Sequence, residues 1–351
     1  MTDLPAEIPG VDFDVLSSWM SDQGLGSGPI TDAIELTGGT QNILVRFERD
    51  GRGYVLRRPP LHKRANSDEA MRREARILGA LTGTAVPHPE LIAAESELDA
   101  MDCAFYLMEP IEGRNVQAEG LTPTQVVDRA TRQRMGLAMV DAAVALGSLD
   151  YEALGMADFG RPEGWLERQV DRWRSHLDGY SEVPEYTGRD EIPHVDEVAR
   201  WLDDNCPTEW SPGLLHGDFH FGNVLFEHDS GELAAVVDWE LATLGDPLMD
   251  LGWLHATWPD PDLPGMGSTI EPWDGFASID ELTAHYAERS NRDLSAATWY
   301  GVMACYKMGI ILEGTHARAQ AGRAPAEFGD LLHATTIGLF ERATHFISTR
   351  P

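Results

Sequence analysis

The feature that most constrains this chain is the segment LLHGDFHFGN at Leu214–Asn223, which is followed by an apolar strand pattern that ends at Asp238. Two apolar runs separated by the polar turn 227–231 predict a β-hairpin here. A hairpin would bring the side chains of Asp218, Asn223 and Asp238 around one point. A carboxylate that accepts a hydroxyl proton, together with two oxygen ligands for Mg²⁺, is what phosphoryl transfer from a nucleotide requires. The Asp-x-x-x-x-Asn spacing alone is common by chance, and the hairpin context makes it informative.

The charge of the chain excludes several classes of partner. Its 351 residues carry a formal net charge of −31, which argues against nucleic acid or an anionic membrane, because neutralising phosphates requires a basic surface. A chain of this length can form two domains with a sizeable core. Lys63 and Lys307 are its only lysines, so a site that normally uses lysine must use arginine here or be absent.

Neither the start of the chain nor its most apolar window indicates a membrane protein. Met1–Asp12 lacks the basic start and apolar core of a secretory signal. Ala296–Leu312 is too short for a span and contains Tyr300 and Lys307, so we expect a buried helix. The cysteines are three and widely spaced, which predicts small buried side chains in a reducing cytoplasm: Cys103, Cys206 and Cys305.

The N-terminal part of the chain has a strand pattern. Short alternating runs separated by glycine or Asp-Gly turns predict strands at Ile34–Leu36, Ile43–Glu48, Tyr54–Arg58 and Phe105–Met108. A helix is expected between the third and the fourth, capped by Ser67. We therefore predict a small antiparallel-sheet lobe over residues 1–109.

Beyond residue 109 the pattern becomes helical, which predicts a larger lobe over residues 110–351 and an α+β bilobal fold overall. The expected helices are Thr122–Leu146, Trp165–Leu177, Val195–Asn205, Ile279–Glu288, Ala296–Ala319 and Ala326–Phe346.

Glu74 lies in the middle of the apolar stripe of the helix that follows Ser67. A buried carboxylate costs several kcal/mol in order of magnitude unless it is paired. Arg57, on the preceding strand, is the best candidate partner, and Arg58 ranks second if the register slips by one. An Arg57–Glu74 ion pair would hold a guanidinium over nucleotide phosphates; the alternative is that both residues are solvated.

Two further segments are candidate nucleotide contacts. Gly38, Gly39 and Thr40 lie between two strands, where backbone N–H groups and a hydroxyl can receive phosphate oxygens; a plain hairpin turn is the alternative. Met108 and Glu109 end the fourth strand and would offer backbone groups to an adenine, although a core strand followed by a linker fits equally well.

Other polar residues near the motif have structural interpretations. We expect His216 to shape the loop, and Asp246 and Asp250 to cap the next helix or brace the loop. A zinc site at His216 and His220 lacks a third ligand and a helix to present the pair. Neither a Gly-x-Ser-x-Gly elbow nor a Gly-x-x-x-x-Gly-Lys-Ser/Thr loop occurs in the sequence, which argues against a serine hydrolase and a P-loop protein.

The motifs together resemble the aminoglycoside phosphotransferase (choline kinase-like) family of the protein-kinase-like fold. The branch that they resemble is the N-terminal kinase-like domain of acyl-CoA dehydrogenase fusion proteins. The segments that carry the resemblance occur in the family's order: 38–42, Val55–Pro60, Glu74, Phe105–Met108, His216–Asn223 and Asp238–Glu240.

The resemblance implies a cytoplasmic small-molecule kinase, monomeric or homodimeric, that uses ATP and Mg²⁺ to phosphorylate a hydroxyl. Asp218 would be the base, Asn223 and Asp238 the Mg²⁺ ligands, Arg57 the phosphate-binding cation in place of the more usual lysine, and Glu74 its partner. Four alternatives stay open: a kinase of a hydroxyacyl-CoA or related lipid-derived alcohol, a non-catalytic nucleotide-binding module, an acyl-CoA dehydrogenase, and a nucleotidyl transferase. For the first, a phosphate site would fall at Arg168, Arg172 and Arg174.

Overall fold

The computed structural model describes residues 8–36, 42–260, 263 and 270–349. The chain divides into two compact units, one of Met1–Arg114 with Ala234–Ala242 and the other of Asn115–Leu233 with Thr243–Pro351. The predicted division into residues 1–109 and 110–351 differs from these units, because residues 234–242 belong with the N-terminal part. The predicted division at residue 109 therefore stays a prediction.

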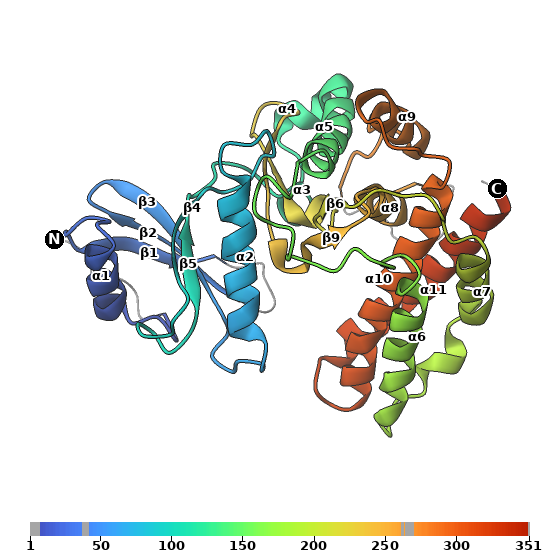
Figure 1. Ribbon diagram of the computed structural model, residues 1–351, viewed down its shortest axis with the longest axis horizontal. Helices are drawn as coiled ribbons and strands as arrows, with labels where there is room; N and C mark the ends of the chain where they lie inside the picture. The colour runs from blue at the N-terminus through green and yellow to red at the C-terminus, as the bar shows by residue number, and fades with distance from the viewer. Residues whose placement is uncertain (1–7, 37–41, 261–262, 264–269, 350–351) are drawn as a thin grey trace. The chain divides into compact units, whose positions relative to one another are not determined.

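The smaller unit contains a five-stranded antiparallel sheet with the strand order β1-β2-β3-β5-β4 (Figure 1). Three of the four predicted strands have nearly the predicted ends, whereas the first begins at Ile30, four residues earlier than predicted. β4 was not predicted because its sequence, LIAAE, has no alternation. The strands are β1 (Ile30–Glu35), β2 (Ile43–Arg49), β3 (Arg52–Arg58), β4 (Leu91–Glu95) and β5 (Phe105–Met108).

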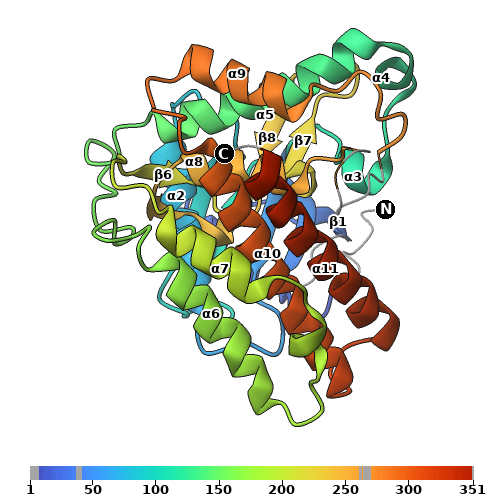
Figure 2. The same ribbon diagram turned by 90° about the vertical axis from the view of Figure 1, so that its right-hand side faces the viewer.

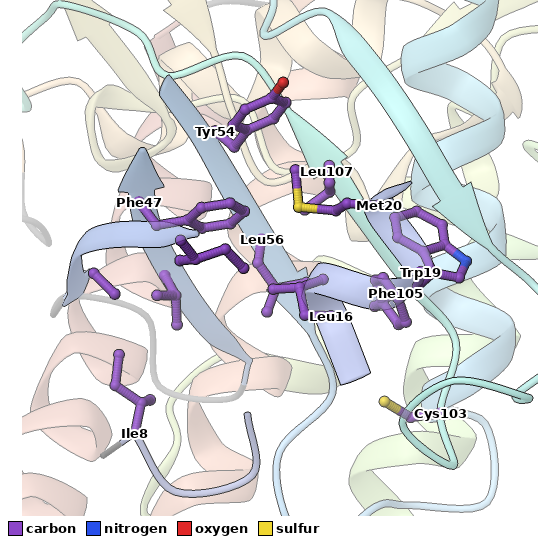
Figure 3. Packing of buried hydrophobic residues seen from close by; sticks show 13 residues of the cluster. Ile8, Leu16, Trp19, Met20, Phe47, Tyr54, Leu56, Cys103, Phe105 and Leu107 are labelled. Carbon is purple, nitrogen blue, oxygen red and sulfur yellow. The ribbon is translucent and has the colours of Figure 1, made fainter. Parts of the chain in front are cut away.

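The helix α1 (Phe13–Asp22) contributes to the apolar core of the smaller unit (Figure 3). It begins at Asp12, whose side chain accepts hydrogen bonds from the backbone N–H groups of Asp14 and Val15. Its buried face includes Trp19, whose ring meets that of Phe105 edge to face at a centroid distance of 4.8 Å. Sequence analysis missed this helix.

The helix α2 (Ser67–Leu81) is the one predicted to follow Ser67 and to run to about Leu81, but Ser67 is not its cap. Ser67 is the first helical residue, and its hydroxyl accepts a hydrogen bond from the backbone N–H of Arg64 instead. The cap position belongs to Asn66, whose side chain makes no capping hydrogen bond. The apolar stripe lies on the buried face as predicted, with Glu74 among it.

A segment that is distant in sequence completes the smaller unit. It contains most of β8 (Leu233–Val236) and the 3₁₀ turn η4 (Trp239–Leu241). The backbone N–H of Val236 donates to the carbonyl of Pro87, and Arg73 Nη2 donates to the carbonyl of Ala242. These bonds join the residues around Asp238 to α2 and to the turn that follows it.

The larger unit is mainly helical (Figure 2). Its short strands are β6 (Gly213–Leu215), β7 (Val224–Phe226) and β9 (Thr243–Gly245), of which β6 and β9 pair. Its α-helices are α3 (Val116–Glu119), α4 (Pro123–Val127), α5 (Arg129–Gly147), α6 (Gln169–Gly179), α7 (Val195–Asp204), α8 (Leu248–Thr257), α9 (Ile279–Arg289), α10 (Ala297–Gln320) and α11 (Ala326–Thr349).

Two of the predicted helices differ from those observed. The single helix expected over Thr122–Leu146 is wrong, because Asp128 has an extended backbone and its side chain caps α5 by accepting from the N–H of Ala130. An Asp competes with helical hydrogen bonding in this way, so it ends α4 and starts α5. The helix expected from Trp165 begins only at Gln169.

The helices α8, α10 and α11 pack against one another in the larger unit, and α10 and α11 lie side by side in both views (Figures 1 and 2). None of the described helices has the length and apolar character that crossing a bilayer requires. Gly252 on α8 allows a close approach to α10, since a Cβ there would lie 2.4 Å from the carbonyl oxygen of Tyr300. The helical core therefore depends on this missing side chain.

Gly252→Ala should lower the free energy of unfolding. Alanine gains about 1 kcal/mol of helix propensity over glycine, but overpacking against a backbone carbonyl costs ~1–3 kcal/mol or more. The control is Gly179→Ala at the end of α6, where a Cβ would meet nothing within 4 Å. Urea denaturation measures both variants. Equal stability of the two would contradict the close packing of α8 on α10.

Candidate functional site

The loop that follows β6 is held by a buried carboxylate. Asp250, on α8, accepts hydrogen bonds from the backbone N–H groups of His216 at 2.7 Å and Gly217 at 2.9 Å. Burial raises the pKa of Asp250, while the electrostatic interaction with His216 and these two hydrogen bonds oppose the rise. Gly217 has a φ of 83°, a left-handed conformation that glycine adopts at little cost. The prediction that Asp250 braces the loop is confirmed.

Lys307 holds the same loop from α10. Its Nζ donates to the carbonyl of Gly217 at 2.9 Å and lies over the rings of Trp173 and Trp253, at 5.6 and 5.1 Å from their centroids. Burial lowers the pKa of Lys307 to about 8, although Asp218 and Asp250 oppose the shift. The sequence signal for this role was a lone lysine inside an apolar helix, and sequence analysis did not use it.

Asp218 and Asn223 are joined by hydrogen bonds. Asn223 Nδ2 donates to both the carbonyl oxygen and Oδ2 of Asp218, each at 2.9 Å. Because these bonds use the nitrogen of the amide, Oδ1 is the Asn223 atom that can bind a cation. Asn223 lies at the end of the 3₁₀ turn η3 (Phe221–Asn223), so the turn fixes the spacing of the pair.

The Asp218 carboxylate lies among groups that favour its ionised form. Burial raises its pKa, but the side-chain hydrogen bond with His220 and the electrostatic interactions with His220, His216 and Lys307 lower it to about 2. His220 Nε2 lies 3.5 Å from Asp218 Oδ1. His216 accepts a hydrogen bond from the backbone N–H of Asp218 at 3.3 Å, which agrees with the expected structural role of that histidine. Asp218 is therefore a carboxylate, not a carboxylic acid, at neutral pH.

In the smaller unit, Arg57 contacts two carboxylates. Its Nε lies 2.9 Å from Glu74 Oε2, and its Nη2 donates to Asp238 Oδ1 at 2.7 Å. Tyr106, on β5, donates from its hydroxyl to Glu74 Oε2 at 2.9 Å. The predicted Arg57–Glu74 pair is confirmed. Removing one partner of such a buried pair costs about 3–5 kcal/mol, because the other charge is left uncompensated.

Glu74 is completely buried, which governs its protonation. Burial raises its pKa to about 7; Asp238 and Glu240 add to the rise, whereas Arg57 and the Tyr106 hydroxyl oppose it. The same neighbours act on Arg57: burial lowers its pKa, but Tyr106, Glu74 and Asp238 outweigh this and raise it, so the guanidinium stays charged. Arg57 therefore keeps its charge whichever form Glu74 takes.

Asp238 lies at the end of β8 in a left-handed conformation, with φ 65° and ψ 65°. Its side chain is 38% exposed, so one carboxylate can contact both Arg57 and a solvent-accessible ligand. Asp218 and Asn223 belong to the larger unit and Asp238 to the smaller one. The meeting of all three around one ion stays a prediction.

The structure describes some of the remaining predicted site residues but not others. Gly38, Gly39 and Thr40 lie outside the described residues. Met108 ends β5 and is half-buried, while Glu109 is exposed and its backbone N–H donates to the carbonyl of Glu90. Arg58, the second-ranked partner of Glu74, donates from Nε to the carbonyl of Pro59 instead.

Comparison with known proteins identifies the family. Residues 32–285 match the model of APH, the phosphotransferase enzyme family. The chain belongs to this family. A putative aminoglycoside phosphotransferase from Ralstonia eutropha has the same fold, with a TM-score of 0.76 and 25% identity over 95% of this chain and 98% of that one. The chain thus has a kinase-like fold, with a small antiparallel sheet and a mainly helical remainder, and this is the predicted fold class.

Several proteins to which the chain is similar are longer than it. Acyl-CoA dehydrogenase family member 11 of Gallus gallus is 30% identical over 307 residues, which are 84% of this chain and 37% of that protein. The rat protein of the same name is 28% identical over 94% of this chain and 42% of its own length. The chain thus spans less than half of these relatives. Hygromycin-B 4-O-kinase of Escherichia coli is 26% identical over 62% of this chain and 60% of its own.

Asp250→Asn should destabilise the protein. The amide keeps one acceptor oxygen, but its NH₂ then faces a backbone N–H, which leaves a buried donor unsatisfied at a cost of ~1–3 kcal/mol. Asp22→Asn, at the exposed end of α1, is the matched control and should change stability by less than about 0.5 kcal/mol. Urea denaturation followed by circular dichroism compares them. An Asp250→Asn protein as stable as the control would show that the two N–H bonds do not brace the loop.

Glu74 should give the protein a defined dependence of stability on pH. Its folded pKa of about 7 lies above the ordinary value of 4.5 for a glutamate, so between these values the folded state holds a proton that the unfolded state has lost. This group's contribution to the free energy of unfolding therefore falls as pH rises from 4.5 to 7 and is constant above. The difference between wild type and Glu74→Gln isolates it, and Glu69→Gln, exposed on the same helix, is the control. A difference that rises over this window would contradict the assignment.

Proposed function

We propose that this chain is an ATP-dependent phosphotransferase that moves the γ-phosphate of the nucleotide to a hydroxyl of a small molecule. Membership of the phosphotransferase family supports this reaction class. The observation that carries the proposal is the Asp218–Asn223 pair, in which an ionised carboxylate is bonded to the amide five residues later. The backbone beside it is fixed by Asp250 and Lys307.

Asp218 would receive the acceptor hydroxyl. A carboxylate with a pKa of about 2 is too weak a base to remove the proton from a free alcohol. It can accept a hydrogen bond that aligns the attacking oxygen, and it takes the proton as the bond to phosphorus forms and the hydroxyl becomes acidic. Its low pKa thus favours orientation of the acceptor over early proton removal.

Asn223 and Asp238 would hold Mg²⁺, which suits their chemistry because it prefers amide and carboxylate oxygens. The ion would neutralise charge on the phosphate oxygens. Arg57 would place its guanidinium toward the phosphates, fixed by Glu74 as lysine is in related kinases of the fold. Gly38, Gly39 and Thr40 would cover the phosphates, and Met108 and Glu109 would lie beside the adenine.

The nucleotide part of this proposal draws support from proteins of the same fold. The aminoglycoside phosphotransferase APH(4)-Ia, with a TM-score of 0.58 and 16% identity, is known in a ternary complex with AMP-PNP and hygromycin B. At this identity the likeness concerns the fold alone, so hygromycin B is one acceptor to test. The relatives named as acyl-CoA dehydrogenases share with this chain only the part that it covers.

The arginines considered for a CoA phosphate site are largely engaged elsewhere. Arg168 donates to the carbonyls of Glu163 and Arg161, and Arg174 pairs with Asp171 and Asp203 at 3.1 Å each. This helix therefore gives no support to a CoA thioester over other hydroxyl-bearing acceptors.

An acceptor screen tests the proposed reaction. The protein is incubated with Mg-ATP and hydroxylated amines, sugars, aminoglycosides or hydroxyacyl thioesters, and ADP release and product mass are measured. A phosphate added to one acceptor class, dependent on Mg²⁺, supports the proposal. Nucleotide binding without transfer to any of these classes would favour a non-catalytic module, and addition of a nucleotidyl group would overturn the phosphotransferase assignment.

Asp218→Asn should lower kcat by about 10²–10⁴-fold or more, because the variant loses the group that orients the hydroxyl. The affinity for Mg-ATP should change little, since the proposed metal ligands remain. Asp204→Asn, exposed at the end of α7, is the control and should retain full activity. Steady-state kinetics and nucleotide titration of the three proteins provide the comparison. Wild-type kcat in Asp218→Asn would remove Asp218 from the reaction.

A further inference from the structure

A second polar cluster lies in the helical unit, on residues that the proposed phosphotransferase does not use. Glu313 and His316 on α10, and His333 on α11, each offer one ligand atom, and these atoms all lie within 4.8 Å of one another. Their exposed fractions are 0%, 5% and 8%. Burying two imidazoles and a carboxylate between apolar helices is costly unless their polar atoms are satisfied.

Glu313 is fully engaged. Tyr186 donates from its hydroxyl to Glu313 Oε1 at 2.8 Å, and His333 Nδ1 lies 2.8 Å from Glu313 Oε2. These two contacts orient the carboxylate and one ring of the cluster. The Tyr186 hydroxyl is an outer contact of the kind that fixes a ligand in a metal site.

The tautomer of His316 follows from its neighbour Gln320. The backbone N–H of Thr187 donates to Gln320 Oε1, so the Gln320 amide nitrogen must be the atom 2.9 Å from His316 Nε2. Gln320 therefore donates to His316 Nε2, and the proton of a neutral His316 lies on Nδ1.

Two ring nitrogens of the cluster remain to be accounted for in the hydrogen bonding. His316 Nδ1 and His333 Nε2 are buried and make no hydrogen bond within the described part of the chain. The carboxylates nearest to them are exposed ones, Asp330 at 3.6 Å from His316 and Glu191 at 3.5 Å from His333. Unpartnered buried nitrogens with acidic groups at their edge are what a cation site with its ion removed would contain.

We propose that Glu313, His316 and His333 form a binding site for a divalent transition metal of the zinc class, with Asp330 or Glu191 completing its coordination. Imidazole and carboxylate ligands together suit Zn²⁺, whereas Mg²⁺ takes oxygen ligands. The two imidazole rings are stacked, with centroids 4.4 Å apart and planes 22° from parallel. Metal binding at His316 Nδ1 requires the other neutral tautomer of that ring, with its proton on Nε2 and the Gln320 side chain turned so that its oxygen accepts from it.

The site is a structural one and is separate from the phosphotransferase chemistry. It joins α10 to α11 and both to the 3₁₀ turn η2 (Gly188–Glu191), which carries Glu191. Three carboxylate side chains, those of Glu313, Asp330 and Glu191, surround the two imidazoles, and a divalent cation would complement them. The metal thus stabilises the packing of these elements without contacting the reacting groups.

Cobalt titration of the wild-type protein is the first test. Tag-free protein is treated with EDTA and then titrated with Co²⁺ in excess Mg²⁺, which occupies oxygen-only sites. We expect one equivalent to produce the intense visible absorption of a low-coordinate nitrogen-containing site, and one equivalent of Zn²⁺ to abolish it. Zn²⁺ should also raise the thermal midpoint of unfolding. Absence of the absorption band would overturn the proposal. The readout contains no kinase step, so this result and the outcome of the acceptor screen are independent.

Substitution assigns the metal to these residues. His316→Gln and His333→Gln should each weaken Co²⁺ affinity by more than the ~10–100-fold typical of losing an outer-shell partner. His285→Gln, a histidine paired with Asp141 on other helices, is the control and should bind like wild type. Should the buried variants misfold, the exposed Asp330→Asn and Glu191→Gln pair serves, and the double variant should bind Co²⁺ about 10-fold more weakly. Unchanged affinity in the folded variants would place the metal elsewhere and refute the site.

Discussion

The loop that carries Asp218 depends on one interaction, the acceptance of two successive backbone N–H groups by the buried carboxylate of Asp250. A loop cannot satisfy its own N–H groups as a helix or a sheet does, so a buried loop requires a partner of this kind. Asp250 comes from a helix, and its position is therefore set by helical packing. Gly217 bends the chain so that both N–H groups reach it. The rigidity of the helical core is in this way transferred to the functional loop.

The smaller unit solves the same problem with a different partner. Glu74 is as deeply buried as Asp250, but it faces a cation and a phenol in place of backbone amides. Arg57 also donates a hydrogen bond to Asp238. The Arg57–Glu74 pair is therefore connected to a residue proposed to bind the metal. A change in the charge of any one of these groups alters the electrostatics of the other two.

A contact could be predicted from the sequence where one residue did not fit its apolar surroundings. A carboxylate in an apolar stripe required a cation, and the alternation of β3 restricted the choice to Arg57 or Arg58. Prediction failed where the controlling contact was distant in sequence, since nothing in the pattern places Lys307 against Gly217 or Arg57 against Asp238. The break at Asp128 was missed for a local reason: an Asp inside a helical pattern is tolerated or ends the helix according to what its side chain can cap. The fold class followed from motif order, while the strand β4 carried no alternation from which to infer it.

The smaller unit is discontinuous, because residues 234–242 complete it after more than a hundred residues of the other unit have intervened. A ribosome therefore releases β1–β5 and α2 long before Asp238 and Trp239 emerge. Until then Arg57 lacks one of its two anionic partners, and α2 lacks the turn that packs on it. The N-terminal unit can therefore be completed only after the loop that carries Asp218 has been synthesised. A nascent chain that stops short of residue 242 lacks part of both halves of the proposed catalytic machinery.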